Sequence, residues 1–255
     1  MFPNYKRTNP PVWLERNSLF RKLYVLRRIL HSTKKYYFSD TDEYVKRIFR
    51  HLAATHLIPE CGFFVDVGCF HPTRSNTTYA LYKRGWRGIN IDVDQIKIEA
   101  FNLRRPQDTN IACAVSKQTG TAKYWRRGLW SDLNSLEQLE RTEDEEGWLE
   151  IEVETDTLTN LIDQTPYKGR AIDFLSIDVE GHNLAVLQSL DFERYRPKVI
   201  CVETWDSRIK EVLQSDLYVF LVAQGYILVN WPNLNLVLLH QDYPPMRVPG
   251  VSSQK

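Results

Sequence analysis

The sequence predicts an α/β fold in which a seven-stranded, mostly parallel sheet follows an N-terminal helical arm. Two observations lead to this prediction. From about residue 62 onwards, short apolar runs alternate with stretches of helical length, as in a parallel sheet that is covered by helices on both faces. The last two predicted strands, 226–230 and 235–240, are separated by only four residues. That connection is too short for a crossover helix, so the sheet should end in an antiparallel hairpin.

The N-terminal arm, residues 1–36, is basic and amphipathic. Residues 1–50 contain 12 Lys and Arg against 4 Asp and Glu, and apolar residues from Leu19 to Leu30 recur at helical spacing. Such a helix could make peripheral contact with an anionic membrane surface. Alternatively, it packs its apolar stripe on the domain and leaves its cations in water, which is the favoured interpretation because surface helices of this kind are common.

The main domain is expected over residues 37–240, with a tail at 241–255. Its other predicted strands are the apolar runs 62–67, 88–93, 110–115, 173–178 and 198–203. The predicted helices are the segments 41–55, 76–84, 95–105, 184–190 and 207–224. Residues 117–160 interrupt this alternation with a turn, a strand at 121–125 and an acidic loop. We interpret that segment as an insertion over the sheet edge.

Composition limits the class of protein. At 255 residues, with 43% hydrophobic residues, the chain can build one ordinary core, and a net charge of +1 argues against nucleic-acid binding by charge alone. The four scattered cysteines suit neither a zinc site nor a disulfide framework and favour a reducing compartment. No apolar run has membrane-spanning length, and the start lacks a signal-peptide pattern. A cytoplasmic protein is therefore expected.

The loop after the first strand is the first candidate site. Gly68 has no Cβ, so a ligand can approach the backbone closely, and Asp66 can anchor an ammonium group or a water. A plain strand–turn with a capping Asp is the alternative. The glycine-rich GxGxxG pattern is absent, since Cys69, Phe70 and Pro72 occupy the loop. A pyrophosphate needs that pattern, whereas a cofactor without phosphates does not.

An acidic residue also closes the second strand. Asp92 lies 26 residues beyond Asp66, where it can accept hydrogen bonds from the hydroxyls of a ribose. Asp94 is expected to cap the following helix instead. Together with the first loop, Asp92 favours an adenosyl group that carries no phosphates.

The third candidate site follows the predicted strand 173–178. Asp178, Glu180 and His182 leave its carboxyl end at alternating positions. One of them could simply cap the next helix while the others face water. Because ionisable groups that cluster at the functional edge of a sheet seldom serve packing alone, a functional role is favoured.

These motifs resemble one known family. The segments 63–71, 85–92, 173–182 and 197–203 are similar to those of the FkbM family of S-adenosylmethionine-dependent O-methyltransferases. The resemblance implies a Rossmann-like class I methyltransferase sheet with strand order 3-2-1-4-5-7-6, S-adenosylmethionine as cofactor, and methyl transfer to a hydroxyl. The stretch 71–77 together with 85–92 resembles a bacterial subgroup associated with polysaccharides and glycoconjugates, so a sugar or glycan acceptor is expected.

The resemblance also assigns residues. Asp66 and Gly68 would line the methionine end of the cofactor, with Cys69 beside them, where the family often has a small residue. Asp92 would bind the ribose. Residues 114–116, including Ala114 and Ser116, would surround the adenine. Residues 178–182 would face the reacting methyl group, so that Asp178 belongs to both the cofactor-binding and the catalytic set.

Methyl transfer to a hydroxyl requires removal of its proton. His182 is the expected base, oriented by Asp178 or Glu180, and His71 is the second candidate. A divalent metal held by Asp178, Glu180 and a histidine is chemically possible but is not required by the spacing, so no metal site is assigned.

The acceptor is expected to meet residues of the insertion. Trp125, Trp130 and Trp148 could stack on sugar rings there, although core packing or a dimer contact suits each of them equally. Two other functions remain open. One is a nicotinamide-dependent oxidoreductase, and the other is a catalytically inactive Rossmann-like binding module.

Overall fold

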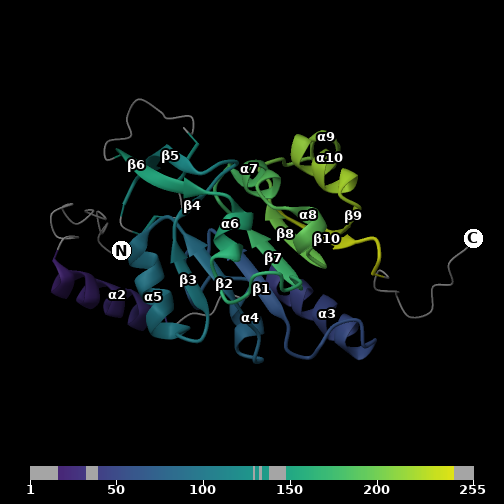
Figure 1. The fold of residues 1–255 in the computed structure, drawn as a ribbon, viewed down its shortest axis with the longest axis horizontal. Coiled ribbons are helices and arrows are strands. Elements are labelled where there is room, and N and C mark those ends of the chain that lie inside the picture. Colours follow the sequence, from purple (N-terminus) through teal and green to yellow (C-terminus); the bar gives the residue numbers. More distant parts are fainter. Residues whose placement is uncertain (1–16, 33–39, 129, 132–133, 138–147, 244–255) are drawn as a thin grey trace, which may run out of the picture.

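The computed structural model describes residues 17–32, 40–128, 130–131, 134–137 and 148–243. Its centre is a seven-stranded sheet with the order β3-β2-β1-β7-β8-β10-β9 (Figure 1). The strands are β1 (Phe63–Val67), β2 (Arg87–Asp92), β3 (Thr109–Ala112), β7 (Phe174–Ile177), β8 (Val199–Glu203), β9 (Tyr226–Asn230) and β10 (Asn235–His240). All pairs are parallel except those of β10, which runs antiparallel to β8 and to β9. The predicted fold class and the strand order 3-2-1-4-5-7-6 are confirmed.

Helices cover both faces of this sheet because side chains alternate along each strand. Phe63, Val65 and Val67 of β1 face one core, where they join residues of α6 (Leu158–Asp163), α7 (Asn183–Gln188) and α8 (Phe192–Tyr195). Phe64 faces the opposite core, formed with α3 (Asp40–Ala54) and α4 (Tyr79–Tyr82). The strands β1, β2, β7, β8 and β10 are buried along nearly their whole length, as continuous apolar runs predict, whereas the edge strands β3 and β9 are mostly only partly buried.

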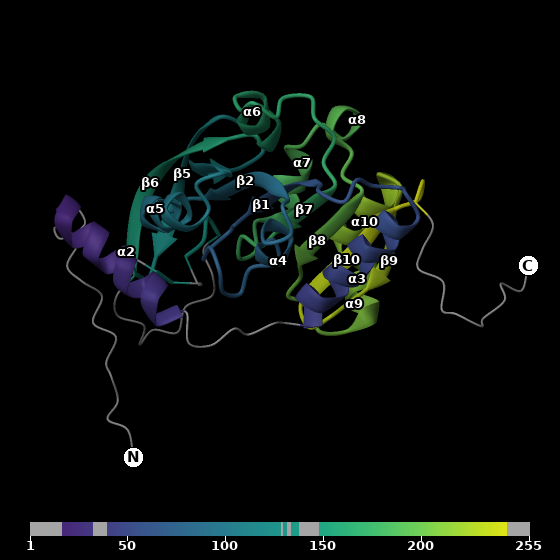
Figure 2. The ribbon, with the colours of Figure 1, turned by 90° about the horizontal axis from the view of Figure 1, so that it is seen from below.

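Two further helices extend the layer beside β2 and β3. The helix α5 (Gln95–Arg104) packs on both strands, and α2 (Ser18–Ser32) packs on α5. Figure 2 shows α2 at one edge of the molecule, with α3, α9 (Ile209–Gln214) and α10 (Asp216–Ala223) at the other. Of the predicted arm, residues 1–16 and 33–36 lie outside the described residues, as do residues 244–255 of the tail.

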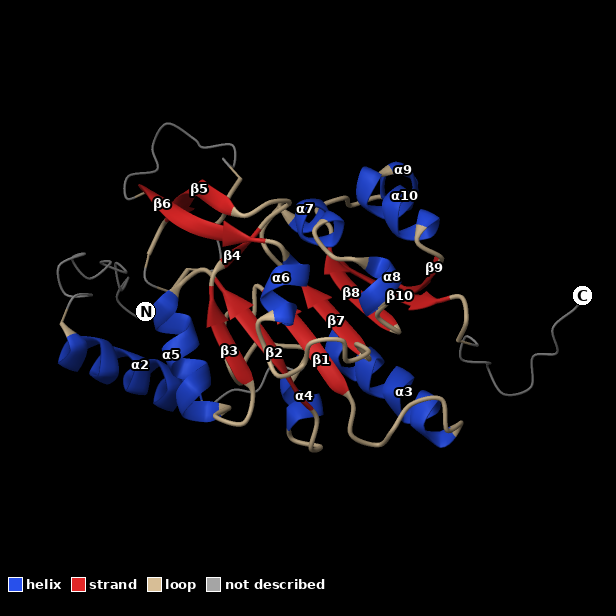
Figure 3. Cartoon of the chain, viewed as in Figure 1, coloured by secondary structure: helices blue, strands red, loops and turns tan. Residues whose placement is uncertain are grey.

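The insertion contains a second sheet, and the prediction of an acidic loop there was wrong over residues 149–156. The strands β4 (Ala114–Val115), β5 (Gly120–Arg126) and β6 (Leu149–Asp156) form it in the order β4-β6-β5. Leu149, Ile151 and Val153 alternate with glutamates along β6, which is the period of a strand with one polar face. The small sheet stands beyond the carboxyl ends of β1, β2 and β3 (Figure 3). Residues 138–147 of the predicted acidic loop lie outside the described residues.

Two other predicted elements are divided. The predicted helix 207–224 is two helices, because Ser215 adopts an extended conformation and its hydroxyl accepts the amide hydrogen bond of Tyr218 as the N-cap of α10. The predicted strand 110–115 breaks at Cys113, where the chain leaves the large sheet and enters the small one.

The structure also bears on the cysteines and on the membrane. Cys61, Cys69, Cys113 and Cys201 are all free thiols. Within the described ranges, none of the helices combines the length and the hydropathy needed to cross a bilayer.

Candidate active site

A cavity lies at the carboxyl ends of β1, β2 and β7, where ligands bind in open α/β sheets. The large sheet supplies its floor, and the insertion covers it from above. The residues that border it are Val67, Gly68, Phe70, Ser75, Ile91, Asp92, Val93, Lys97, Cys113, Val115, Tyr124, Asn134, Ser135, Leu136, Asp178, Val179 and Glu180.

Gly68 is where β1 and β7 approach each other most closely. Its φ is +77°, and a Cβ there would lie 1.8 Å from the carbonyl oxygen of Asp178. No side chain fits at that distance. The predicted need for glycine at position 68 therefore has a steric cause, which is close approach to a neighbouring strand end.

Asp92 borders the cavity in a network of buried charges. Its carboxylate accepts hydrogen bonds from the amides of Phe70 and Asp94, and the Lys97 ammonium lies 3.3 Å away. Burial raises the pKa of Asp92, which Lys97 opposes. Burial would lower the pKa of Lys97, but Asp92 and Asp94 outweigh it, and this pKa is raised. The Lys97 ammonium thus stabilises the charged form of the Asp92 carboxylate at the end of β2 against the effect of burial.

Asp94 occupies the N-cap position of α5, but its side chain makes no capping hydrogen bond. The capping role that we predicted for this side chain is therefore wrong. Its carboxylate contacts Lys97 at 3.1 Å and Arg126 at 3.2 Å, and it accepts hydrogen bonds from Tyr124 and Asn134. Asp94 thus joins α5 to the insertion.

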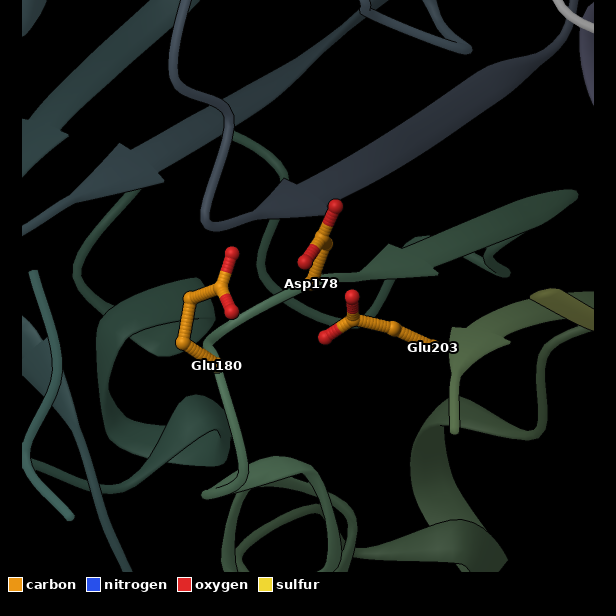
Figure 4. Close-up of side chains that lie close together, drawn as sticks. All are labelled: Asp178, Glu180 and Glu203. Carbon is orange, nitrogen blue, oxygen red and sulfur yellow. The ribbon is translucent and has the colours of Figure 1, made fainter. Parts of the chain in front are cut away.

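Three carboxyl groups converge on the other side of the cavity. Asp178, Glu180 and Glu203 each place one oxygen within 4.8 Å of those of the other two (Figure 4). Burial, together with the neighbouring carboxyl of Glu203, raises the pKa of Asp178 well above its usual range. Burial also raises the pKa of Glu203, and Glu180 adds to that effect. Asp178 and Glu203 can therefore share a proton at neutral pH.

His182 is oriented by a residue that the sequence analysis did not identify. Its Nδ1 lies 2.6 Å from Oε1 of Glu137, and its Nε2 lies 3.1 Å from the Ser116 hydroxyl. Since a carboxylate only accepts, Nδ1 carries a proton and Nε2 is the acceptor when the ring is neutral. The expected orientation by Asp178 or Glu180 is wrong. The described contacts of Nδ1 and Nε2 are with Glu137 and Ser116.

Asp66 supports the first loop rather than the cavity. It is 4% exposed and accepts hydrogen bonds of 2.8 Å from Asn76 and Thr78. The fully buried Arg105, at the end of α5, completes this network. Its guanidinium donates to the carbonyl of Pro72 and to the side chains of Asn76, Thr78 and Asn90. The network fixes the loop, and the expected contact of Asp66 with a ligand is not supported.

His71 is also turned inward. Its Nδ1 accepts hydrogen bonds from the amides of Thr73 and Arg74, both at 3.1 Å. Burial, with nearby arginines adding to it, lowers the pKa of His71 to about 3, so the ring is neutral at pH 7. A ring with so low a pKa is a poor acceptor of a proton at neutral pH, so a role as second base is not supported.

Two predicted cofactor contacts point away from the cavity. The Cys69 side chain is 1% exposed and packs against Ile98 and Phe101. Ala114 is fully buried, whereas its neighbours Cys113 and Val115 border the cavity. A strand turns successive side chains to opposite faces, so the prediction for Ala114 was displaced by one residue.

The comparison with protein families agrees with this arrangement. Residues 66–228 match the methyltransferase FkbM domain. The chain belongs to the FkbM methyltransferase family. The matched range runs from Asp66 at the end of β1 into the terminal hairpin and includes each described cavity residue. No curated protein matches the chain.

Solved structures give a weaker likeness. Monomeric WbdD matches with a TM-score of 0.42 and 12% identity, covering 78% of this chain and 40% of the WbdD chain. This chain therefore spans less than half the length of that relative. A TehB-like SAM-dependent methyltransferase from Corynebacterium glutamicum matches with a TM-score of 0.38 and 11% identity, covering 78% of this chain and 97% of the other.

Four residues of the site were missed by the sequence analysis, namely Lys97, Arg105, Glu137 and Glu203. Lys97 carried a signal, because it is a cation between Ile96 and Ile98 on a helix. Arg105 carried no such signal, since it stands between Arg104 and Pro106 at the end of that helix. Glu203 ends an apolar strand, as Asp92 does. Glu137 carried no recognisable sequence signal, since it stands in a segment rich in acidic residues and far from His182 in the chain.

The first-loop network predicts a large loss of stability in Arg105→Met. The substitution keeps much of the buried volume but leaves Asp66 without its nearby cation and four acceptors without their donor. We expect the free energy of unfolding to fall by about 3–5 kcal/mol, measured by urea denaturation. Arg104→Met, at the exposed neighbouring position, is the control. Equal stability of the two variants would contradict the role of the network.

The buried histidine predicts an acid-sensitive stability. An unfolded histidine has a pKa of about 6.5, whereas that of His71 is about 3 in the folded protein. Between these values only the unfolded chain binds the proton, so stability present at neutral pH is lost as the pH falls. His71→Gln should reduce the slope of unfolding free energy against pH by about 1.4 kcal/mol per unit below pH ~6. Urea unfolding at several pH values measures it, and exposed His56→Asn is the control. An unchanged slope in His71→Gln would refute this assignment.

Proposed function

We propose that the protein is an S-adenosylmethionine-dependent O-methyltransferase that acts on a hydroxyl of a sugar, a polysaccharide or glycoconjugate, or a related small molecule. One observation carries the proposal beyond membership of the family. Asp92 at the end of β2 and Asp178 after β7 border a cavity at the carboxyl ends of the strands, and His182, two residues beyond the cavity residue Glu180, places its Nε2 3.1 Å from the Ser116 hydroxyl.

The residues of the cavity suit this cofactor. Asp92 would accept hydrogen bonds from the ribose, Cys113 and Val115 would flank the adenine, and Gly68 and Asp178 would lie at the methionine end. Bound S-adenosylmethionine would supply a methyl group activated by a positively charged sulfonium. Carboxyl groups at the rim favour such a cation. They disfavour the pyrophosphate of a nicotinamide cofactor, which would also lack a glycine-rich loop.

His182 is the proposed general base. With its proton on Nδ1 and Glu137 as acceptor, Nε2 is free to take a proton from an acceptor hydroxyl once that hydroxyl replaces Ser116. The imidazolium that forms is stabilised by Glu137 at 2.6 Å. Glu137 is therefore a positioning residue. The pKa values of Asp178 and Glu203 are raised, and a protonated carboxyl of this pair would donate a hydrogen bond to a bound group.

The proposed ribose contact makes a prediction for cofactor binding. Asp92→Asn should weaken S-adenosylmethionine binding about tenfold or more, or about 1.5–3 kcal/mol, because a charged hydrogen-bond acceptor is lost. Isothermal titration calorimetry measures the effect. Asp108→Asn is the control, since Asp108 is buried to a similar extent (8% against 6% exposed) but precedes β3 at the opposite edge of the sheet.

Unchanged affinity in Asp92→Asn would move the ribose site elsewhere, and an equal loss in both variants would indicate a general structural effect. A thermal-shift comparison of S-adenosylmethionine, S-adenosylhomocysteine and NAD with the unmodified protein separates the three candidate functions. Stabilisation by NAD alone would favour the oxidoreductase. A response to the methyl donor without any turnover on a glycan panel would favour the inactive module.

The proposed base makes a kinetic prediction. With an acceptor found by screening glycans against labelled donor, His182→Ala should lower kcat about a hundredfold or more while donor affinity stays near that of the wild type. Glu137→Gln should lower kcat less than His182→Ala does, because the ring loses the carboxylate acceptor that fixes the proton on Nδ1.

His71→Gln, assayed beside these variants, should change kcat only a fewfold. Full turnover in His182→Ala would contradict the assignment of His182 as the base. Activity that is abolished by a chelator and restored by magnesium would instead point to a metal at Asp178, Glu180 and Glu203.

A further inference from the structure

Among the described residues, the contacts that hold the N-terminal helix α2 on the domain centre on one face of the helix. Val25 and Ile29 are buried there and pack with Ile96 and Ala100 of α5 and with Trp130 of the insertion. Polar contacts support this face, since Arg21 pairs with Glu99 at 3.2 Å and the Arg28 guanidinium lies 5.2 Å from the centre of the Trp130 ring. These contacts account for the docking of α2 on the domain, so its other side chains are not needed for it.

The opposite face of α2 carries a leucine stripe, which we define as Leu19, Leu23, Leu26 and Leu30. Spacings of four, three and four residues place these side chains on one line along the helix. They are 65%, 57%, 48% and 57% exposed. Figure 2 shows that α2 lies at the edge of the molecule, outside α5. Four large apolar side chains in one exposed row are more than scattered surface leucines, and such a patch indicates an interaction site.

The charges beside the leucine stripe indicate what it binds. Lys22 and Arg27 are exposed and flank the stripe on its two sides. The helix has four Lys and Arg residues and no Asp or Glu. The sequence adds cations just before and after it, at Arg16, Lys34 and Lys35. An apolar row between cations is complementary to a surface that offers both hydrocarbon and negative charge.

We propose that α2 binds the surface of an anionic lipid bilayer, with the leucine stripe among the acyl chains and its cations at the headgroups. A helix of 15 residues is about 22 Å long, too short to cross a hydrocarbon core of about 30 Å, so it lies along the interface. A second copy of the chain is a poorer occupant, because pairing two such helices along the leucine stripe would bring Lys22 and Arg27 of one copy close to the same cations of the other.

Vesicle co-sedimentation of the full chain tests the proposal. Vesicles of phosphatidylcholine alone are compared with vesicles that contain about one third phosphatidylglycerol. We expect at least tenfold tighter binding to the anionic vesicles, and a decline in that binding when salt is raised from about 50 to about 500 mM. The double variant Leu23→Gln/Leu26→Gln should lose at least tenfold in binding.

Matched control variants distinguish the loss of this binding surface from general effects of substituting exposed residues. Leu103→Gln/Leu213→Gln removes two leucines that are 60% and 44% exposed on α5 and α9, and it should bind as the wild type does. Lys22→Glu/Arg27→Glu should bind anionic vesicles at least tenfold more weakly, whereas Lys117→Glu/Lys210→Glu should not. Circular dichroism verifies that each variant is folded.

Three results would overturn the proposal. The first is no preference for anionic vesicles, and the second is an equal loss in the stripe and control variants. The third is a dimer in analytical ultracentrifugation that Leu23→Gln/Leu26→Gln abolishes, which would assign the stripe to a second copy. The vesicle assay measures membrane binding and not methyl transfer. If the proposed enzymatic function were wrong, the proposal for α2 could therefore still be tested.

Discussion

The close contact between the ends of β1 and β7 is the constraint on which the candidate site depends. Position 68 has room for a hydrogen atom only, because a Cβ would lie 1.8 Å from the carbonyl oxygen of Asp178. The two strands are parallel neighbours, and the amide of Asp178 donates to the carbonyl of Val67. The loop after β1 is bonded to the end of β2, since the amides of Gly68 and Cys69 donate to the carbonyl of Ile91. Asp92 and Asp178 both border the cavity at these strand ends.

The charges around that space are arranged unequally. On the side of β2, Lys97 and Arg126 lie against Asp92 and Asp94 and balance their charges. On the side of β7, the carboxyls of Asp178, Glu180 and Glu203 face one another. Groups so arranged disfavour one another's charged forms, and the pKa values of Asp178 and Glu203 are raised. The site therefore combines balanced charges at the end of β2 with a cluster of carboxyls after β7, an arrangement suited to a ligand that is positively charged near β7.

The insertion and the N-terminal helix complete the site from distant parts of the chain. Tyr124 and Asn134 bind Asp94, Ser135 binds the backbone of Glu180, and Glu137 orients His182. Trp130, which the sequence offered as a residue that could stack on a sugar, is 7% exposed and packs with α2 instead. Phe70 belongs to the same cluster and also borders the cavity, so the docking of α2 and the shape of the cavity share a contact.

The sequence by itself determined the large sheet, its mostly parallel order, the terminal hairpin and the strand ends that carry the site, because apolar periodicity and short connections are local properties. Acidic residues at the ends of predicted strands can also be identified from the sequence, and Asp92 and Asp178 do lie beside the cavity. The direction of individual side chains was decided only by the tertiary structure. Ala114 and Cys69 differ from their cavity-facing neighbours by a single position along the chain, and His71 is turned inward by two amides of its own loop. The pairing of Glu137 with His182 joins residues 45 positions apart, and no local pattern encodes a contact that exists only once the insertion has folded over the sheet.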